Sequence, residues 1–363
     1  MPRNPRTLIL TLALAGAATF AADDWRNLNT ETTPELAANE IQFIKELNGE
    51  LWIGTLSGLT RYHDGEFAVV SQVTEEKRRN PETGEWETVD TVAKAERQIC
   101  DVLKAGDDTY LVGTAGGVCK MENLILDGVA LKGRTVAPVL HYTDNIIWAL
   151  AKNDSAGTST VYEKTKEDWQ PVDAFADRAV VDVLKTADDR FWSIIDGNGV
   201  LEVNPEEGPG QAEHHLQGLN VRTLMRDSQK RVWFGLWGRG VAMMDKDGAW
   251  KEYLEDEKSA VLTIAEDGAG NIWVGTSSSG LFRFDGKEWT NHLGEEGAVS
   301  LLFSDSAGHL WVSTQRGGGL RYRKDGEWQR SLDSPLPITC MAEHDGALWA
   351  GGVLDGIHIL DRE

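Results

Sequence analysis

The chain has 363 residues, of which 41% are hydrophobic and 26% charged, and this composition predicts a folded protein with a sizeable core. It contains 58 acidic and 36 basic side chains, which gives a formal net charge of −22. Because such a surface repels phosphate backbones and anionic lipid headgroups, we expect neither a nucleic acid nor a membrane surface as a partner.

Residues 1–21 are predicted to be a signal peptide. Arg3 and Arg6 supply positive charge, residues 7–20 form an apolar run, and Thr19-Phe20-Ala21 resembles a cleavage site with small residues at both ends. The run is too short to span a bilayer. A buried N-terminal strand or helix is the alternative interpretation. We therefore expect residues 22–363 to form a periplasmic or secreted protein, with no membrane insertion after signal cleavage.

An aromatic residue recurs along the chain at nearly constant spacing. By subtraction the successive separations are 58, 38, 44, 41, 40, 38 and 38 residues. A period near 40 residues is typical of units of four short strands. The eight anchors are Trp52, Tyr110, Trp148, Trp192, Trp233, Trp273, Trp311 and Trp349.

Each repeat reads as four strands, which we label a to d. In the clearest one, residues 260–265 predict strand a, residues 271–275 strand b, residues 281–284 strand c, and strand d begins at Trp289. Such a unit is apolar on both faces and needs a similar sheet on either side. The sequence therefore predicts an all-β protein, an eight-bladed β-propeller of four-stranded antiparallel blades. We expect the anchors to fill the space between blades rather than to bind a ligand.

Ring closure is predicted from the two chain ends. In several repeats a second aromatic residue follows the anchor by 15 to 17 residues, but the sequence ends 14 residues after Trp349. Residues 23–28 match residues 287–292, which contain the strand d of another repeat. We expect the N-terminal segment to supply the outer strand of the last blade.

The long first gap predicts an added hairpin at about residues 68–92. Two β-rich runs flank a polar turn that contains Pro and Gly. We expect this hairpin to extend the outer edge of blade one, either as a solvated projection or as a docking element for a protein partner.

Neither metal sites nor disulfides are predicted. Cys100, Cys119 and Cys340 lack the spacing of a zinc site and fit predicted strands as buried residues. His214 and His215 are adjacent, so on an extended chain they point in opposite directions, and the sequence offers no identifiable third ligand. We expect no metal and no cofactor.

The phrases Leu51-Trp52-Ile53-Gly54-Thr55 and Ile272-Trp273-Val274-Gly275-Thr276 resemble the two-component-regulator propeller repeat. That resemblance implies a β-propeller like the periplasmic sensor regions of hybrid histidine kinases, which respond to polysaccharide fragments. The sequence ends at Glu363 without a membrane helix or kinase region, so the resemblance implies extracytoplasmic recognition only. The repeat is also similar to that of streptogramin-lyase-like propellers, which makes an enzyme an alternative.

Candidate binding residues lie in the b to c loops, which should open on one face together with the d to a loops, at the mouth of the channel. Trp237 and Arg239 combine an aromatic face for a sugar ring with a guanidinium for a carboxylate, although Trp237 could instead cap a blade interface. Arg316, two blades away, would add to a local preference for anions. The complete set of candidate ligand-binding residues is Asp196, Asn198, Trp237, Arg239, Gln315, Arg316 and Asp355.

These observations favour an extracytoplasmic propeller that binds a carbohydrate-like or small anionic ligand without catalysis. No catalytic residue is assigned, because the sequence contains no nucleophile motif, phosphate-binding loop or metalloprotease motif. One alternative is a lyase or hydrolase that acts on a polysaccharide or a cyclic peptide at the same mouth. Another is an assembly scaffold that docks a protein partner through the blade-one hairpin.

Overall fold

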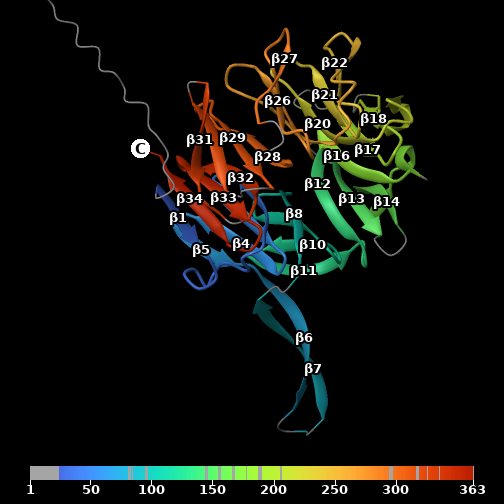
Figure 1. Ribbon diagram of the computed structural model, residues 1–363. Coiled ribbons are helices and arrows are strands. Elements are labelled where there is room, and N and C mark those ends of the chain that lie inside the picture. The colour runs from blue at the N-terminus through green and yellow to red at the C-terminus, as the bar shows by residue number, and fades with distance from the viewer. Residues whose placement is uncertain are drawn as a thin grey trace, which may run out of the picture.

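A computed structural model describes residues 24–362 apart from residues 81–82, 84, 95–96, 144–145, 154–156, 166–167, 177, 187–189, 205–206, 294–296, 316–318, 325 and 335. The strands of this part of the chain form eight sheets arranged in a ring (Figure 1). Seven sheets have four strands in antiparallel order, and one has six. The predicted eight-bladed β-propeller is therefore confirmed.

The blades follow one another in chain order, each running from the innermost strand a to the outermost strand d. Blades one to four contain β2 (Ile41–Leu47), β3 (Glu50–Thr55), β4 (Gly58–His63) and β5 (Glu66–Val69); β8 (Ile99–Lys104), β9 (Thr109–Thr114), β10 (Gly117–Glu122) and β11 (Ile125–Ala130); β12 (Thr135–Thr143), β13 (Ile146–Asn153), β14 (Thr158–Lys164) and β15 (Trp169–Pro171); and β16 (Val180–Lys185), β17 (Phe191–Ile195), β18 (Val200–Val203) and β19 (Glu213–His215).

The later blades have the same plan with shorter outer strands. Blades five to eight contain β20 (Val221–Arg226), β21 (Val232–Leu236), β22 (Val241–Met244) and β23 (Trp250–Tyr253); β24 (Val261–Glu266), β25 (Ile272–Thr276), β26 (Leu281–Phe284) and β27 (Trp289–Asn291); β28 (Val299–Ser304), β29 (Leu310–Thr314), β30 (Leu320–Lys324) and β31 (Glu327–Leu332); and β32 (Ile338–His344), β33 (Ala347–Gly352), β34 (Ile357–Asp361) and β1 (Trp25–Leu28). The described elements also include two 3₁₀ turns, η2 (Asp173–Phe175) and η3 (Pro209–Gln211).

The anchor residues pack between blades, as predicted. All eight are buried. Trp233 of blade five packs in a cluster with Val261 and Ile264 of blade six, and Trp273 of blade six packs with Val299 and Leu302 of blade seven. Their regular spacing therefore reflects the packing of the ring, and they are unavailable to a ligand.

Aspartates in the a to b turns hold several anchors in place. The Asp267 carboxylate accepts hydrogen bonds from the backbone nitrogens of Ala269 and Asn271, at 3.0 and 2.9 Å, and from Trp273 Nε1 at 2.7 Å. Asp227 and Asp305 bond the indoles of Trp233 and Trp311 in the same manner. Each carboxylate thus ties a turn to the buried indole that follows it.

Every inner strand contains an irregularity in its register near its first residue. In blade five the Cα pairing with β21 skips from Val221 to Thr223, which leaves Arg222 as an extra residue. The residue before each bulge is a buried Ile or Val, whereas no bulged residue is buried. An extra residue opposite a single partner re-aims its side chain. The bulged residues are Gln42, Cys100, Ala137 and Pro138, Val181, Arg222, Leu262, Ser300 and Thr339.

The N-terminal strand closes the ring, as predicted from the repeat count. β1 pairs with β34 through four antiparallel residue pairs, from Trp25 opposite Leu360 to Leu28 opposite Ile357. The indole of Trp25 packs edge-on against Trp311 of blade seven at 5.9 Å between centroids, and its Nε1 donates a 3.0 Å hydrogen bond to Ser331. Blade eight is therefore assembled from both ends of the sequence.

The hairpin belongs to blade two rather than to blade one, so the predicted edge was wrong. Strands β6 (Ser71–Arg79) and β7 (Trp86–Lys94) pair with each other, and β6 pairs in parallel with β11 at Ser71 and Gln72. Strand β5 completes blade one and ends at Val69, after which the chain crosses to the free edge of β11. Figure 1 shows the hairpin projecting away from the ring.

The predicted signal peptide lies outside the described residues. Within the part of the chain that the structure does describe, no helix has the length and hydropathy needed to cross a bilayer.

Candidate functional site at the channel mouth

Five inner strands border an open cavity of about 540 Å³ near their starts. Its lining comes from β2, β8, β12, β16 and β20, together with Lys152 from β13. Four of the lining positions are bulges, at Cys100, Ala137 with Pro138, Val181 and Arg222. Each inner strand starts where a d to a loop ends. This cavity therefore opens on the face where the sequence predicts the channel mouth.

The cavity wall is more basic than the protein as a whole. Three of its residues are basic, namely Lys45, Lys152 and Arg222, and two are acidic, Asp101 and Asp182. The whole chain instead has 58 acidic and 36 basic residues. A ligand at this wall therefore meets a local excess of positive charge within a strongly acidic protein.

One ion pair braces the wall between blades one and two. Lys45 Nζ lies 2.8 Å from Asp101 Oδ1 and donates a second hydrogen bond, also 2.8 Å, to the Val102 carbonyl oxygen. Asp101 Oδ2 accepts a 2.8 Å bond from the backbone nitrogen of Val139 in blade three. Because these groups already bond one another across three blades, they position the inner strands.

The pKa of Asp182, a carboxyl group of this wall, is raised above its ordinary value. Asp182 is exposed at the surface of the cavity, but the surrounding protein partly desolvates its carboxyl group, and this raises the pKa of Asp182. A 2.8 Å hydrogen bond from the Val183 nitrogen and the charge of Lys152 oppose the rise, and the charge of Asp101 adds to it. Perturbed carboxyl groups in cavities are candidates for binding or proton transfer.

Trp237 lies at the mouth and stacks against Arg222. The guanidinium carbon of Arg222 is 5.3 Å from the centroid of the Trp237 rings, and Trp237 is 58% exposed. Its backbone is fixed, because its nitrogen donates a 2.9 Å bond to the Asn220 carbonyl oxygen and the residue forms an isolated bridge with Ala260. Arg222 and Trp237 thus offer a guanidinium and an aromatic face side by side.

Arg239 does not join Trp237. Its guanidinium forms a 3.0 Å ion pair with Glu252 on β23, the outermost strand of blade five, whereas Arg222 lies on the innermost strand. Gln315 is exposed in the b to c loop of blade seven, where its nitrogen bonds the Ala298 carbonyl oxygen at 2.8 Å. Arg316 lies outside the described residues.

The other candidate residues have contacts within their own loops. Asn198 accepts hydrogen bonds from Gly218 N at 3.0 Å through its side chain and from His214 Nε2 at 2.6 Å through its carbonyl oxygen. Asp196 is exposed in the same loop.

In blade eight, Asp355 accepts 2.8 and 3.0 Å hydrogen bonds from Ser334 and His358. Burial acts to raise the pKa of Asp355, but these two hydrogen bonds outweigh it and the pKa is lowered. Asp355 is therefore an ionised carboxylate engaged with its neighbours.

A polar cluster borders Trp237 on the side of blade six. Glu257 Oε1 accepts hydrogen bonds from the hydroxyl groups of Ser259 and Ser279, both at 2.7 Å. Burial acts to raise the pKa of Glu257, but hydrogen bonds from Ser259 and Ser279 prevail and lower it. The Gly238 nitrogen bonds the Ser259 carbonyl oxygen at 3.3 Å, so this cluster is joined to the Trp237 loop.

Sequence reasoning missed Arg222, Asp182 and Lys152. Each lies in a strand, whereas the sequence-based prediction of the mouth rests on loop residues. One signal was available: Arg222 is a cation directly after the Val that begins an inner strand, where the corresponding residue of blade six is Leu262.

A segment of the sequence and the fold of the chain are similar to those of known proteins. The family model described as "Two component regulator propeller" matches residues 257–278. A search of curated protein sequences gives no significant match. The computationally designed Ika8 protein superposes with a TM-score of 0.59 at 13% identity, over 89% of this chain and 96% of that chain.

Two natural structures are similar at the level of the fold. The extracellular domain of BT4673 from B. thetaiotaomicron aligns with a TM-score of 0.50 at 16% identity, over 91% of this chain and 51% of that one, so this chain spans about half of its length. Virginiamycin B lyase from Staphylococcus aureus aligns with a TM-score of 0.54 at 11% identity, over 93% of this chain and 99% of the lyase. The matched segment of blade six is thus similar to a two component regulator propeller repeat, and the ring of eight blades shows the propeller fold.

Proposed function

We propose that the protein is an extracytoplasmic binding propeller that recognises an acidic carbohydrate at the channel mouth. The observation that supports this proposal is the pairing of Arg222 with the exposed Trp237. Among the described residues, no carboxylate forms an ion pair with Arg222, so its guanidinium is available to an anionic group. The free face of Trp237 suits a sugar ring.

The electrostatics of the wall favour the same class of ligand. Lys152 and Arg222 extend the positive surface inward from the rim, while Lys45 is already paired with Asp101. A ligand with a carboxylate or sulfate group next to a pyranose ring would contact the guanidinium and the indole together. Similarity of the fold to an extracellular domain is consistent with a ligand met outside the cytoplasm.

Thermal unfolding in the presence of oligosaccharides tests the proposal. The probes are oligomers that contain uronic acid, each compared with the neutral oligomer of equal length. A ligand present at 100 times its dissociation constant should stabilise the protein by about 2.7 kcal/mol. We expect this gain with the acidic oligomers only, and its loss in Trp237→Ala and Arg222→Gln.

Arg239→Gln is the matched control, because Arg239 is paired with Glu252. If Arg239→Gln abolishes binding while Arg222→Gln does not, the original prediction for Arg239 is correct and the present assignment is wrong. Equal binding of neutral and acidic oligomers would contradict the role given to the guanidinium, and undiminished binding by Trp237→Ala would contradict the site.

A second candidate function is catalysis on such a ligand. The observation in its favour is Asp182, whose pKa is raised within the cavity beside Lys152. A carboxyl group that retains its proton nearer to neutral pH can act as a general acid. Cleavage of the oligosaccharide by the unaltered chain, abolished in Asp182→Asn, would establish catalysis with Asp182 as the general acid. If the unaltered chain binds the oligosaccharide but does not cleave it, Asp182 is not a general acid for this ligand.

The location proposed for the mature protein is the periplasm or the surrounding medium. Its support is the predicted signal peptide together with the fold similarity to an extracellular domain. Cell fractionation and N-terminal mass spectrometry provide the test. We expect a chain that begins at Ala22 outside the cytoplasm, and an intact Met1 in the cytoplasm would contradict the proposal.

A further inference from the structure

Blade four carries three potential metal ligands on one face of its outer strands. In the pairing of β18 with β19, Glu202 lies directly opposite Glu213, and Val200 lies opposite His215. Side chains two residues apart on a strand share a face, so His215 is on the same side as Glu213. His214 is on the other side, where its Nε2 lies 2.6 Å from the Asn198 carbonyl oxygen.

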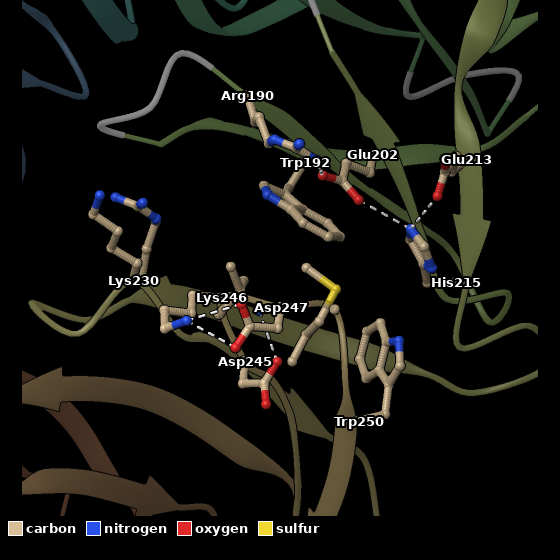
Figure 2. A pocket seen from close by; sticks show the side chains of 14 residues that line it. Arg190, Trp192, Glu202, Glu213, His215, Lys230, Asp245, Lys246, Asp247 and Trp250 are labelled. Atoms are coloured by element: carbon tan, nitrogen blue, oxygen red, sulfur yellow. Dashed lines mark hydrogen bonds and ion pairs between the residues drawn. The ribbon is translucent and has the colours of Figure 1, made fainter.

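The ligand atoms of these three side chains converge on one point. His215 Nε2 is 3.1 Å from Glu202 Oε2 and 3.6 Å from Glu213 Oε2. All three atoms lie within 4.8 Å of one another. Figure 2 shows the two carboxylates approaching the same imidazole nitrogen from different sides.

This spacing is the spacing of a tetrahedral metal site. Bonds of about 2.1 Å from zinc to histidine nitrogen and carboxylate oxygen place neighbouring ligand atoms about 3.4 Å apart. The two separations from His215 lie on either side of that value. The two carboxylates lie within 4.8 Å of each other, and the exposed side chain of Glu213 could adjust around a small divalent ion without movement of the strands.

The charges of the cluster favour a cation between the carboxylates. Two like charges directly opposite each other across a pair of strands are destabilising. Arg190, immediately before β17, forms an ion pair with Glu202 Oε1, which leaves Oε2 directed at His215. Glu213 has no comparable arginine among its described contacts, and its side chain is 73% exposed. A divalent ion would relieve the repulsion that a single imidazole relieves only in part.

Glu202 and His215 are held in position for this role. The Glu202 side chain is only 6% exposed, and although burial acts to raise its pKa, the contacts with His215 and Arg190 prevail and lower it. The imidazole of His215 lies between two indoles, with centroids 5.6 Å from Trp192 and 5.5 Å from Trp250. Both side chains are thus preorganised, as ligands supported by neighbouring groups usually are.

We propose that Glu202, Glu213 and His215 bind a divalent transition metal ion such as Zn²⁺. Three protein ligands leave one tetrahedral position for water or a further ligand. The three ligands line a cavity of about 380 Å³, whose wall on the side of blade five includes Lys230 and Trp250 (Figure 2). This site lies on the face of the a to b and c to d turns, away from the channel mouth, and does not depend on the function proposed there.

The experiment uses the mature chain without an affinity tag, treated with EDTA and dialysed. Isothermal titration with ZnCl₂ measures affinity and stoichiometry, and Co²⁺ provides a visible absorption spectrum that reports tetrahedral coordination. We expect about one ion per chain. Glu213→Gln and His215→Asn should each weaken binding at least tenfold and remove the cobalt spectrum.

His214→Asn is the matched control, because the neighbouring histidine faces away from the cluster. It should bind zinc as the unaltered chain does. Glu213→Gln changes an exposed side chain and removes one of the two facing charges, so its melting temperature in EDTA should be no lower than that of the unaltered chain, which separates loss of the site from loss of the fold. The proposal is overturned if no stoichiometric ion binds, or if Glu213→Gln and His215→Asn bind zinc as tightly as the unaltered chain does.

Discussion

Substitution of Trp25 by alanine tests how far one strand from the N-terminal segment secures the ring. Trp25 is 9% exposed and packs against Trp311 of the neighbouring blade, and its Nε1 is the hydrogen-bond partner of the buried Ser331 hydroxyl group. Truncation of a buried tryptophan to alanine costs about 3–5 kcal/mol, and leaving a buried hydroxyl group without its partner adds about 1 kcal/mol. We therefore expect the free energy of unfolding to fall by about 4–6 kcal/mol.

The assay is urea denaturation of the mature chain, followed by both tryptophan fluorescence and far-UV circular dichroism. Arg26→Ala is the control on the same strand, since the Arg26 side chain is 59% exposed and, among the described residues, its ion-pair partner is the exposed Asp361. An exposed ion pair contributes less than about 1 kcal/mol. If Trp25→Ala costs no more than Arg26→Ala, the closing strand does not stabilise the ring in the way argued here.

Three further predictions concern the channel, the turns and the hairpin. The pKa of Asp182 is raised in the folded state, so the free energy of unfolding should fall as the pH rises from about 3.8 through the folded-state pKa. At pH 7 the Asp182→Asn variant should therefore unfold at a higher urea concentration than the unaltered chain. This difference in urea midpoint should vanish as the pH is lowered to about 3.8. Asp267→Ala removes the acceptor of five hydrogen bonds, from Ala269, Asn271 and Trp273, and should cost about 2–4 kcal/mol in urea denaturation, more than Asp285→Ala in an exposed turn. Equal losses would contradict the role of the carboxylate. Replacement of residues 73–92 by a short turn should leave the melting temperature within about 2 °C, since β6 pairs with blade two only at Ser71 and Gln72, and a large fall would show that the hairpin supports the ring.

The repeat pattern predicts the ring because each blade is built from local contacts. The anchor spacing gives the blade count, and the match between residues 23–28 and residues 287–292 identifies the closing strand. The edge that receives the hairpin could not be predicted in this way. Blades one and two both present an outer edge near Ser71, and which one is free depends on where β5 ends in space.

The candidate sites depend on relations between strands, which the order of residues does not reveal. Glu202 and His215 are 13 residues apart, and only the register of β18 with β19 brings them together. Arg222 approaches Trp237 because a bulge re-aims its side chain. The glycines that flank Trp237 indicate its exposure, but the sequence predicts Arg239 as its partner, whereas Arg239 pairs with Glu252 and Arg222 lies against Trp237.

The bulges of the inner strands place a residue that packs in the core directly beside a residue that lies outside it. The Ile or Val before each bulge is buried in the core, whereas the bulged residue is not buried and differs from blade to blade, from Gln42 through Arg222 to Thr339. Substitutions at the exposed positions among them can therefore alter the chemistry of the surface with little effect on the packing of the blades. The same fold can in this way acquire new ligands through substitutions of bulged residues, which can change in one blade independently of the others.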